Sequence, residues 1–275
     1  MKAAGLLYNV RLINNAVTLT VEASDPAIAT ANYNATTGSV SLTGTQGRSS
    51  DFTSADIVSQ TSASTTYQKG VGSIVNQPTL ASERLSVNTP SVGGVDLSYT
   101  RIGVWSIWNT NYGGYQTATG IFGVSTLASD MPRSGSASYT TSINASATQN
   151  SGTFPNFRVD QATSAVNFTA NFGANTLSTS LNLNAFPQTG ISNGLPIYST
   201  TAVPLVNLSG SGTISSTGST FAGTLLATNA TMTGQFAGGF LGPQAAEMAY
   251  FFGVSGTFPT GYDGFVLGAV AGRKP

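Results

Sequence analysis

Apolar and polar residues alternate with period two along most of this chain, which is the pattern of β-strands that bury one face. The alternation is clearest in residues 17–22, 39–43, 166–172 and 177–183. Residues 172–175 separate the last two segments as a turn and predict a hairpin. Helical periodicity is confined to short turns near residues 55–58 and 243–248. Turn residues recur every ~8–12 residues, so the pattern predicts an all-β sandwich or barrel.

A change in composition divides the chain. Residues 76–94 are rich in Pro, Gly and polar side chains, as connecting segments are. The region before them is rich in Ser and Thr, whereas longer strand patterns begin at residue 95. The length of 275 residues also exceeds the ~100–150 residues that are commonest for one domain. We therefore predict an N-terminal β subdomain over residues 1–90 and a second β domain over residues 91–275.

Composition argues against several classes of function. Charged residues make up only 7% of the chain, with 10 basic and 10 acidic side chains, so no basic patch exists to bind nucleic acid. The absence of Cys removes disulfides and thiolate metal sites, and the absence of His removes the commonest general base and metal ligand. No run of ~18 apolar residues is present to span a membrane as a helix. The first residues are too few and too polar to be a signal peptide.

One catalytic motif occurs, the G-x-S-x-G pattern at residues 190–194. The serine of that motif needs a His base and a strand-to-helix turn, but this chain has no His and places prolines on both sides of the motif. No lysine lies in an S-x-x-K arrangement, and the carboxylates form no recognisable pair for glycoside hydrolysis. Glu247 follows a Pro-led turn, which favours a structural role. We expect no catalytic residue, no metal site and no enzymatic activity.

Aromatic residues gather between positions 105 and 115. This segment contains both tryptophans, Trp105 and Trp108, together with Tyr112 and Tyr115, and its Asn-Tyr-Gly-Gly-Tyr sequence predicts a hairpin tip. Exposed aromatic side chains on loops often anchor a partner, because they bury a large area at a small cost in entropy. The alternative is core packing, in which Trp105 points into the core and Tyr115 begins the next strand. All four are candidate ligand- or partner-binding residues, with Trp108 and Tyr112 favoured.

The end of the chain carries an ordered set of motifs. It fits the pattern G-x-F-x-G-P-x-A-x-E, then an apolar strand, then a final G-x-F/V-x-G-x-R/K. The matching positions are Gly238, Phe240, Gly242, Pro243, Ala245 and Glu247, followed by Gly268, Val270, Gly272 and Lys274. This series resembles the closing signature of the transferrin-binding protein B family, bacterial surface lipoproteins built on a small eight-stranded β-barrel.

Further segments resemble the same family in the expected order. Tyr99, Gly103 and Trp105 resemble its opening barrel strand, and residues 131–139 resemble its M-P-x-x-G-x-A-x-Y segment. Residues 168–177 resemble its D-F-G-x-x-x-L hairpin, with Asn171 in place of the usual Asp. Residues 33–40 and 49–52 resemble the smaller domain that precedes the barrel.

The resemblance implies an all-β fold, with an N-terminal handle-like subdomain followed by an antiparallel eight-stranded β-barrel. It implies a non-enzymatic binding protein at the outer-membrane surface or in the periplasm of a Gram-negative bacterium. Such a protein captures an iron-, haem- or solute-bearing cargo, and its partners are that protein or small-molecule cargo and an outer-membrane transporter. A signal segment and a lipid anchor, neither of which is in this chain, would attach it to the membrane.

Other interpretations stay open. A haemophore-like protein would use haem as its cofactor, although folding requires none. Without His its axial ligand would be Tyr or Met, with Tyr112 or Tyr115 the better candidates because Met131 and Met248 lie in scaffold motifs. An enzyme that uses carboxylates has no supporting motif. A membrane-embedded barrel predicts outward apolar girdles and a terminal aromatic residue, whereas this chain ends in Arg-Lys-Pro.

Overall fold

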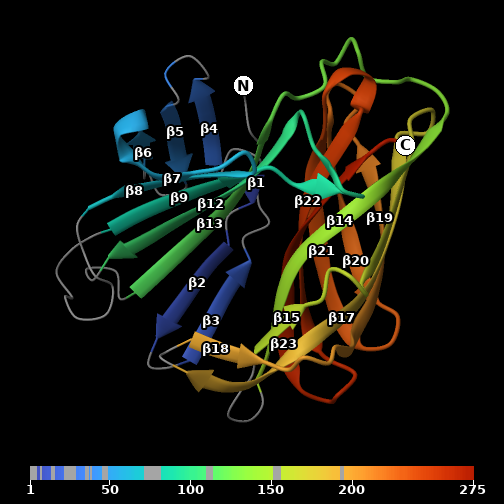
Figure 1. Ribbon diagram of the computed structural model, residues 1–275. Coiled ribbons are helices and arrows are strands. Elements are labelled where there is room, and N and C mark those ends of the chain that lie inside the picture. Colours follow the sequence, from blue (N-terminus) through green and yellow to red (C-terminus); the bar gives the residue numbers. More distant parts are fainter. Residues whose placement is uncertain are drawn as a thin grey trace. The chain divides into compact units, whose positions relative to one another are not determined.

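In the computed structural model, nearly all regular structure is β-strand, arranged in two units (Figure 1). The structure describes residues 5–6, 8–13, 16–21, 29–34, 37, 39–44, 49–70, 82–109, 114–150, 156–192 and 195–275. The first unit comprises Met1–Pro90 and Asp96–Ser125, and the second comprises Ser91–Val95 and Thr126–Pro275. None of the helices in these described ranges is long and apolar enough to cross a membrane.

The first unit is built on a six-stranded antiparallel sheet. Its strand order is β1 (Gly5–Leu6), β13 (Gly114–Gly123), β12 (Thr100–Asn109), β9 (Ser82–Asn88), β8 (Ser64–Lys69) and β7 (Ile57–Gln60). A three-stranded sheet contains β4 (Ala29–Asn34), β5 (Ser39–Gly44) and β6 (Ser49–Phe52), and the 3-10 turn η2 (Ser54–Asp56) follows it. Strands β2 (Tyr8–Ile13) and β3 (Ala16–Val21) form a separate hairpin. At the boundary between the units, β10 (Ser91–Val92) pairs with β11 (Val95–Asp96).

Two expectations about the middle of the chain were wrong. Residues 82–88 were assigned to a connecting segment, but they form β9 between β8 and β12, with Leu85 fully buried. The alternation of Leu85 and Val87 with polar residues provides the buried face of this strand, despite the prolines that flank it. Residues 76–81 lie outside the described residues. The segment from Tyr99 to Trp105, expected to open the barrel, instead leads into β12 of the first unit.

The core of the first unit lies between its three-stranded and six-stranded sheets. It contains Val40, Leu42, Phe52, Tyr67, Leu85, Trp105 and Phe122. Gly103 and Gly120 face each other across β12 and β13, and the Phe122 ring lies against both. A Cβ atom at Gly103 would lie only 2.0 Å from that ring, so glycine is needed there for the ring to pack.

The second unit contains a closed ring of eight antiparallel strands. Around the ring these are β14 (Ser136–Gln149), β16 (Ala165–Asn171), β17 (Thr176–Ser192), β19 (Val203–Ile214), β20 (Thr220–Ala227), β21 (Thr231–Leu241), β22 (Glu247–Thr257) and β23 (Asp263–Arg273). Pairing of β14 with β23, from Thr140 opposite Arg273 to Gln149 opposite Gly264, closes the ring. Two short strands, β15 (Asn156–Val159) and β18 (Leu195–Tyr198), pair with the end of β17. The predicted all-β fold, with an N-terminal β region and an eight-stranded antiparallel barrel, is confirmed.

The predicted hairpin of residues 166–183 is also confirmed. Strands β16 and β17 pair from Ala165 opposite Asn182 to Asn171 opposite Thr176. The Oδ1 atom of Asn171 accepts a hydrogen bond from the Ala174 amide at 3.0 Å, which stabilises the turn between the two strands. An Asn therefore makes the turn contact that an Asp at this position would make.

The predicted division into domains of residues 1–90 and 91–275 stays a prediction about independent folding. The two units of the structure differ from that division at one place, because residues 96–125 group with the first unit. The reason is physical: β12 and β13 hydrogen-bond to each other, and β12 also hydrogen-bonds to β9, so their pairing partners lie in the first unit.

Candidate functional site

The aromatic hairpin, strands β12 and β13, carries the residues that sequence reasoning selected. Trp108 lies directly opposite Tyr115 in the register of the two strands, and Asn109 lies opposite Gly114 at the end of the ladder. Tyr112 lies outside the described residues. The predicted hairpin is therefore present, and its backbone brings positions 108 and 115 together.

Trp105 differs from the other three candidates because it is a core residue. It is only 6% exposed and belongs to the core cluster of the first unit. The register of β12 places it opposite Ala118 and, on the other side, opposite Leu85 of β9. Trp105 therefore packs within the core of the first unit.

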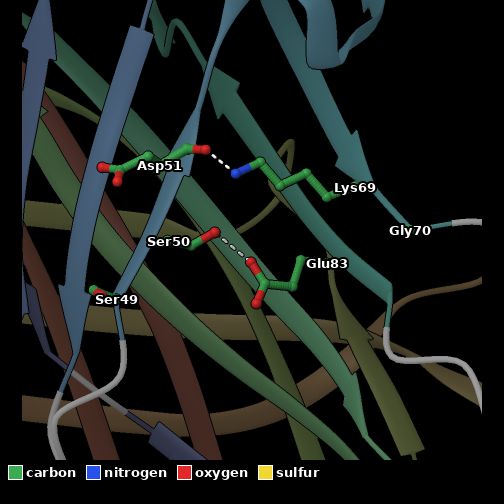
Figure 2. Close-up of a pocket in the computed structure, with 6 residues that line it drawn as sticks. All are labelled: Ser49, Ser50, Asp51, Lys69, Gly70 and Glu83. Carbon is green, nitrogen blue, oxygen red and sulfur yellow. Dashed lines mark hydrogen bonds between the residues drawn. The ribbon is translucent and has the colours of Figure 1, made fainter.

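A polar hollow with a volume of about 350 Å³ also opens in the first unit (Figure 2). Its lining residues come from β6, from the end of β8 and from β9: Ser49, Ser50, Asp51, Lys69, Gly70 and Glu83. The Lys69 ammonium group donates a hydrogen bond to the Asp51 carbonyl oxygen and lies 5.1 Å from the centre of the Phe52 ring. The Ser50 hydroxyl donates to the Glu83 carboxylate. These contacts join β6 to β8 and β9, which gives the charged groups of the hollow a structural role.

The interior of the barrel is filled by its own side chains. Eight aromatic rings form a continuous cluster: Tyr139, Phe168, Phe172, Phe221, Phe236, Phe240, Tyr250 and Phe252. Phe168 and Tyr250 stack with their ring centres 5.7 Å apart, and Phe221 and Phe240 lie 5.0 Å apart. A barrel of eight strands is just wide enough for side chains or for one small ligand, and here side chains occupy the interior.

The two tyrosines inside the barrel, Tyr139 and Tyr250, are hydrogen-bonded through their hydroxyl groups. The Tyr139 hydroxyl donates to the Ala245 carbonyl oxygen at 2.7 Å, and the Tyr250 hydroxyl is 2.8 Å from the Thr179 hydroxyl. Burial raises the pKa of both Tyr139 and Tyr250 well above the usual value of a tyrosine. Both hydroxyl groups are therefore engaged within the barrel.

The G-x-S-x-G motif lies in a strand pair, not in a nucleophile elbow. Residues 190–192 are the end of β17, and Ser192 lies opposite Leu195 of β18. Ser192 therefore ends a strand that pairs with another strand, whereas the serine of a nucleophile elbow lies in a strand-to-helix turn. Within the described ranges, no group of three or more His, Cys, Asp or Glu residues could hold a metal ion.

Comparison with known proteins assigns the barrel to a family. Residues 131–274 match the family model of the C-lobe and N-lobe β-barrels of Tf-binding protein B (TbpB). This match extends over more than half of the chain. The chain belongs to the TbpB barrel family. Among curated proteins, none matches the chain in sequence.

Solved TbpB structures are similar to the chain at low sequence identity. Intact Ap-TbpB, with both lobes, is 16% identical with a TM-score of 0.47, over 98% of this chain and 46% of that protein. A double mutant of the TbpB vaccine antigen from Haemophilus parasuis Hp5 is 16% identical with a TM-score of 0.47, over 97% of this chain and 44% of the other. Isotype 1 TbpB from serogroup B Neisseria meningitidis is 14% identical with a TM-score of 0.44, over 94% and 46%. The chain spans less than half the length of these proteins.

The central residues of the TbpB signature connect β21 to β22 through a turn in which Gly242 and Ala245 are buried. Gly242 begins the turn η4 (Pro243–Ala245), in which Gln244 and Ala245 both have positive φ angles of 52° and 57°. Such angles are unfavourable for residues with a side chain, so surrounding contacts must hold this turn in place.

Four groups from elsewhere in the second unit make those contacts. The Tyr139 hydroxyl binds the Ala245 carbonyl oxygen, and the Thr126 hydroxyl binds the Gly242 carbonyl oxygen at 2.7 Å. The Asp130 carboxylate accepts from the Gln244 amide at 2.8 Å, and the Lys274 amide donates to the Ala246 carbonyl oxygen at 2.9 Å. The TbpB signature therefore includes a turn that these contacts tie into the scaffold of the barrel.

Proposed function

We propose that this chain is part of a non-enzymatic binding protein of a Gram-negative bacterium, held at the outer-membrane surface or in the periplasm. It captures an iron-, haem- or solute-bearing cargo that an outer-membrane transporter then takes up. Membership of the TbpB barrel family supports this proposal, since the named members are transferrin-binding proteins. A lipid anchor outside this chain would hold it at the membrane.

The main observation behind this proposal is that side chains fill the interior of the barrel. Phe168, Phe236, Phe240, Tyr250 and Phe252 are all almost completely buried inside it. A cargo must therefore bind to the outside of the protein, through loops and strand ends, as a protein cargo does. The candidate contact is the end of the aromatic hairpin, where the backbone pairs position 108 with position 115 and residue 112 lies between them in sequence.

Trp108, Tyr112 and Tyr115 are the proposed anchors of that contact. Large aromatic side chains dominate the energy of many protein interfaces, whereas most surrounding residues contribute little. Trp105 supports the hairpin from the core and is not proposed as a contact. A binding role without catalysis also agrees with the absence of His and with the hairpin position of the G-x-S-x-G motif.

Binding of iron-loaded transferrin to the immobilised protein tests this proposal. The Trp108→Ala and Tyr112→Ala variants should each weaken binding by ~1–3 kcal/mol, which is roughly 5- to 150-fold in Kd. Tyr262→Ala is the matched control, because Tyr262 is an exposed tyrosine of the second unit and should leave Kd unchanged. Circular dichroism of each variant checks that it is folded. Transferrin binding that survives both hairpin substitutions would exclude the hairpin as the contact.

Haem is the second candidate cargo, and the state of the interior tyrosines restricts its ligand. Tyr139 and Tyr250 are buried and hydrogen-bonded, so the proposed iron ligand is Tyr112 or Tyr115. A saturable Soret shift that disappears in Tyr112→Phe or Tyr115→Phe would favour the haemophore. A Soret titration without saturation, together with transferrin binding, would favour the protein cargo.

A further inference from the structure

One part of the barrel wall continues past the ring of eight strands. Beyond Ala185, strand β17 no longer pairs with β19 and instead runs between β15 and β18. We call residues 156–159, 185–192 and 195–198 the β17 extension. Among the strands that the structure describes, β18 pairs with β17 alone, so its other edge is open.

Arg158 of β15 is stacked between two aromatic rings of this extension. The central carbon of its guanidinium group is 5.2 Å from the centre of the Phe186 ring and 5.3 Å from that of the Tyr198 ring. Register explains the arrangement, because Arg158 lies directly opposite Phe186, and Tyr198 lies opposite Gln188, two positions further along β17. Stacking over ring faces fixes the plane of a guanidinium group while its N–H donors stay free at the edge of that plane.

The guanidinium group has no hydrogen-bond acceptor among the residues that the structure describes, and Arg158 is exposed. Arg133 provides the contrast, since it donates to the Ala128 and Ser216 carbonyl oxygens at 2.8 and 3.1 Å. The donors of Arg133 are used within the fold. Those of Arg158 lie close to two aromatic rings and have no acceptor among the described residues.

Among the residues that the structure describes, no carboxylate forms an ion pair with Arg158. Asp160 is its nearest acidic neighbour in sequence, but the Asp160 carboxylate accepts from the Ala162 amide at 3.1 Å and the Thr163 hydroxyl at 2.6 Å, which close its own turn. From residue 161 to residue 246 the sequence contains no charged residue at all. A single oriented cation in a long neutral region complements a single anion, and a carboxylate matches the planar, paired donors of a guanidinium group.

A β-bulge adds an apolar neighbour on the same face. The register of β17 and β18 shifts between Gln188 and Gly190, so Ile191, opposite Pro196, comes to the face that carries Tyr198. Without the extra residue Ile191 would lie on the opposite face. The side chain of Ile191 is 62% exposed, and Pro196 is exposed beside it.

A series of polar side-chain contacts adjoins these rings. Asn156 accepts from the Thr148 hydroxyl at 3.0 Å and donates to the Gln188 side chain at 2.9 Å, and Gln188 donates in turn to the Gly190 carbonyl oxygen at 3.0 Å. The chain of bonds ties β14 and β15 to the bulge in β17. A preorganised surface of this kind loses little entropy when a partner binds.

We infer that the β17 extension is a docking surface for a polypeptide partner. The partner places an Asp or Glu carboxylate against the edge of the Arg158 guanidinium group and an adjacent apolar side chain against Ile191 and Pro196. Charge complementarity favours this occupant, because the surface offers apolar contacts and a cation that has no ion-pair partner among the described residues. The inference is independent of the aromatic hairpin and of the cargo proposed above.

Nuclear magnetic resonance of the side-chain Nε–Hε group of Arg158 in the full chain tests the inference. The probe is the capped tripeptide acetyl-Leu-Glu-Leu-amide at millimolar concentration, compared with its Leu-Gln-Leu counterpart and with acetate. We expect a saturable shift of the Arg158 signal with the Glu peptide alone, weakened by added salt, while the Arg133 signal stays in place. Arg158→Lys, which keeps the charge but loses the planar donors, should weaken binding at least severalfold.

Each other outcome would overturn the inference. Equal shifts with the Glu and Gln peptides would show that the carboxylate is not recognised. Acetate binding as tight as the Glu peptide would indicate a small-anion site and not a polypeptide surface. Unchanged affinity in Arg158→Lys would remove the role of the stacked guanidinium plane. The absence of any saturable shift would exclude the site.

Discussion

Replacement of Tyr139 by Phe tests whether the signature turn depends on one buried hydrogen bond. The Tyr139 hydroxyl donates to the Ala245 carbonyl oxygen at 2.7 Å, and both residues are buried. The substitution keeps the ring contacts with Phe168 and Phe240 but leaves the carbonyl oxygen without this donor. An unsatisfied buried polar group costs ~1–3 kcal/mol. For a domain of ~150–250 residues, that loss lowers Tm by about 2–12 °C.

The assay uses the uneven distribution of tryptophan. Both tryptophans, Trp105 and Trp108, belong to the first unit, so tryptophan fluorescence reports its unfolding, whereas near-ultraviolet circular dichroism of the tyrosines also reports the barrel. In Tyr139→Phe, we expect the barrel transition to move to lower temperature. Tyr139→Ala should move it further, because loss of a buried aromatic ring costs ~3–5 kcal/mol.

Tyr262→Phe is the control for the hydroxyl itself. Tyr262 is 51% exposed, and such surface changes usually stay within about ±0.5 kcal/mol. If Tyr139→Phe and Tyr262→Phe had the same free energy of unfolding, the hydrogen bond to Ala245 would contribute nothing, and the turn would have to be held by its other contacts.

The remaining predictions also concern the barrel. The pKa values of Tyr139 and Tyr250 are raised in the folded state, so the stability they contribute is complete below their unfolded pKa of about 10 and is lost as pH rises above it. Thermal unfolding measured between about pH 8 and pH 11 should show Tm falling as pH rises, and Tm should fall less steeply in Tyr250→Phe. Equal slopes of Tm against pH in the two proteins would contradict a raised pKa for Tyr250. Gly238→Ala would place Cβ 2.1 Å from the Ala249 carbonyl oxygen, and overpacking of this kind costs ~1–3 kcal/mol or more. Gly239→Ala is its control, with a nearest contact at 3.5 Å, and equal denaturation midpoints for the two variants would refute the close approach.

Much of the local structure could be predicted from sequence, because alternation and turn chemistry act over a few residues. The period-two pattern of residues 166–183 predicted the β16–β17 hairpin, and the Pro-led turn at Pro243 became η4. The absence of His, read directly from the chain, already argued against the commonest catalytic and metal chemistry. The aromatic hairpin was found for the same reason, since its two strands are neighbours in sequence.

Partners between distant strands could not be predicted in this way. The same alternation suits any neighbour, so nothing local showed that β9 lies beside β12 or that β14 closes the ring against β23. The contacts of Arg158 with Phe186 and Tyr198 depend on the register of three strands, β15, β17 and β18. The bulge after Gln188 then shifts the pairing of β17 with β18 by one residue, which places Ile191 on the same face.

The sequence by itself therefore determined which segments are strands, where they turn and which chemistry is missing. Only the tertiary structure decided that Trp105 is a core residue and that the barrel interior is full. The physical reason is that a strand's pattern records only that one of its faces is buried. Which residues cover that face depends on ladder pairing across the whole sheet, and so does the position of each aromatic ring, inside the core or at the surface.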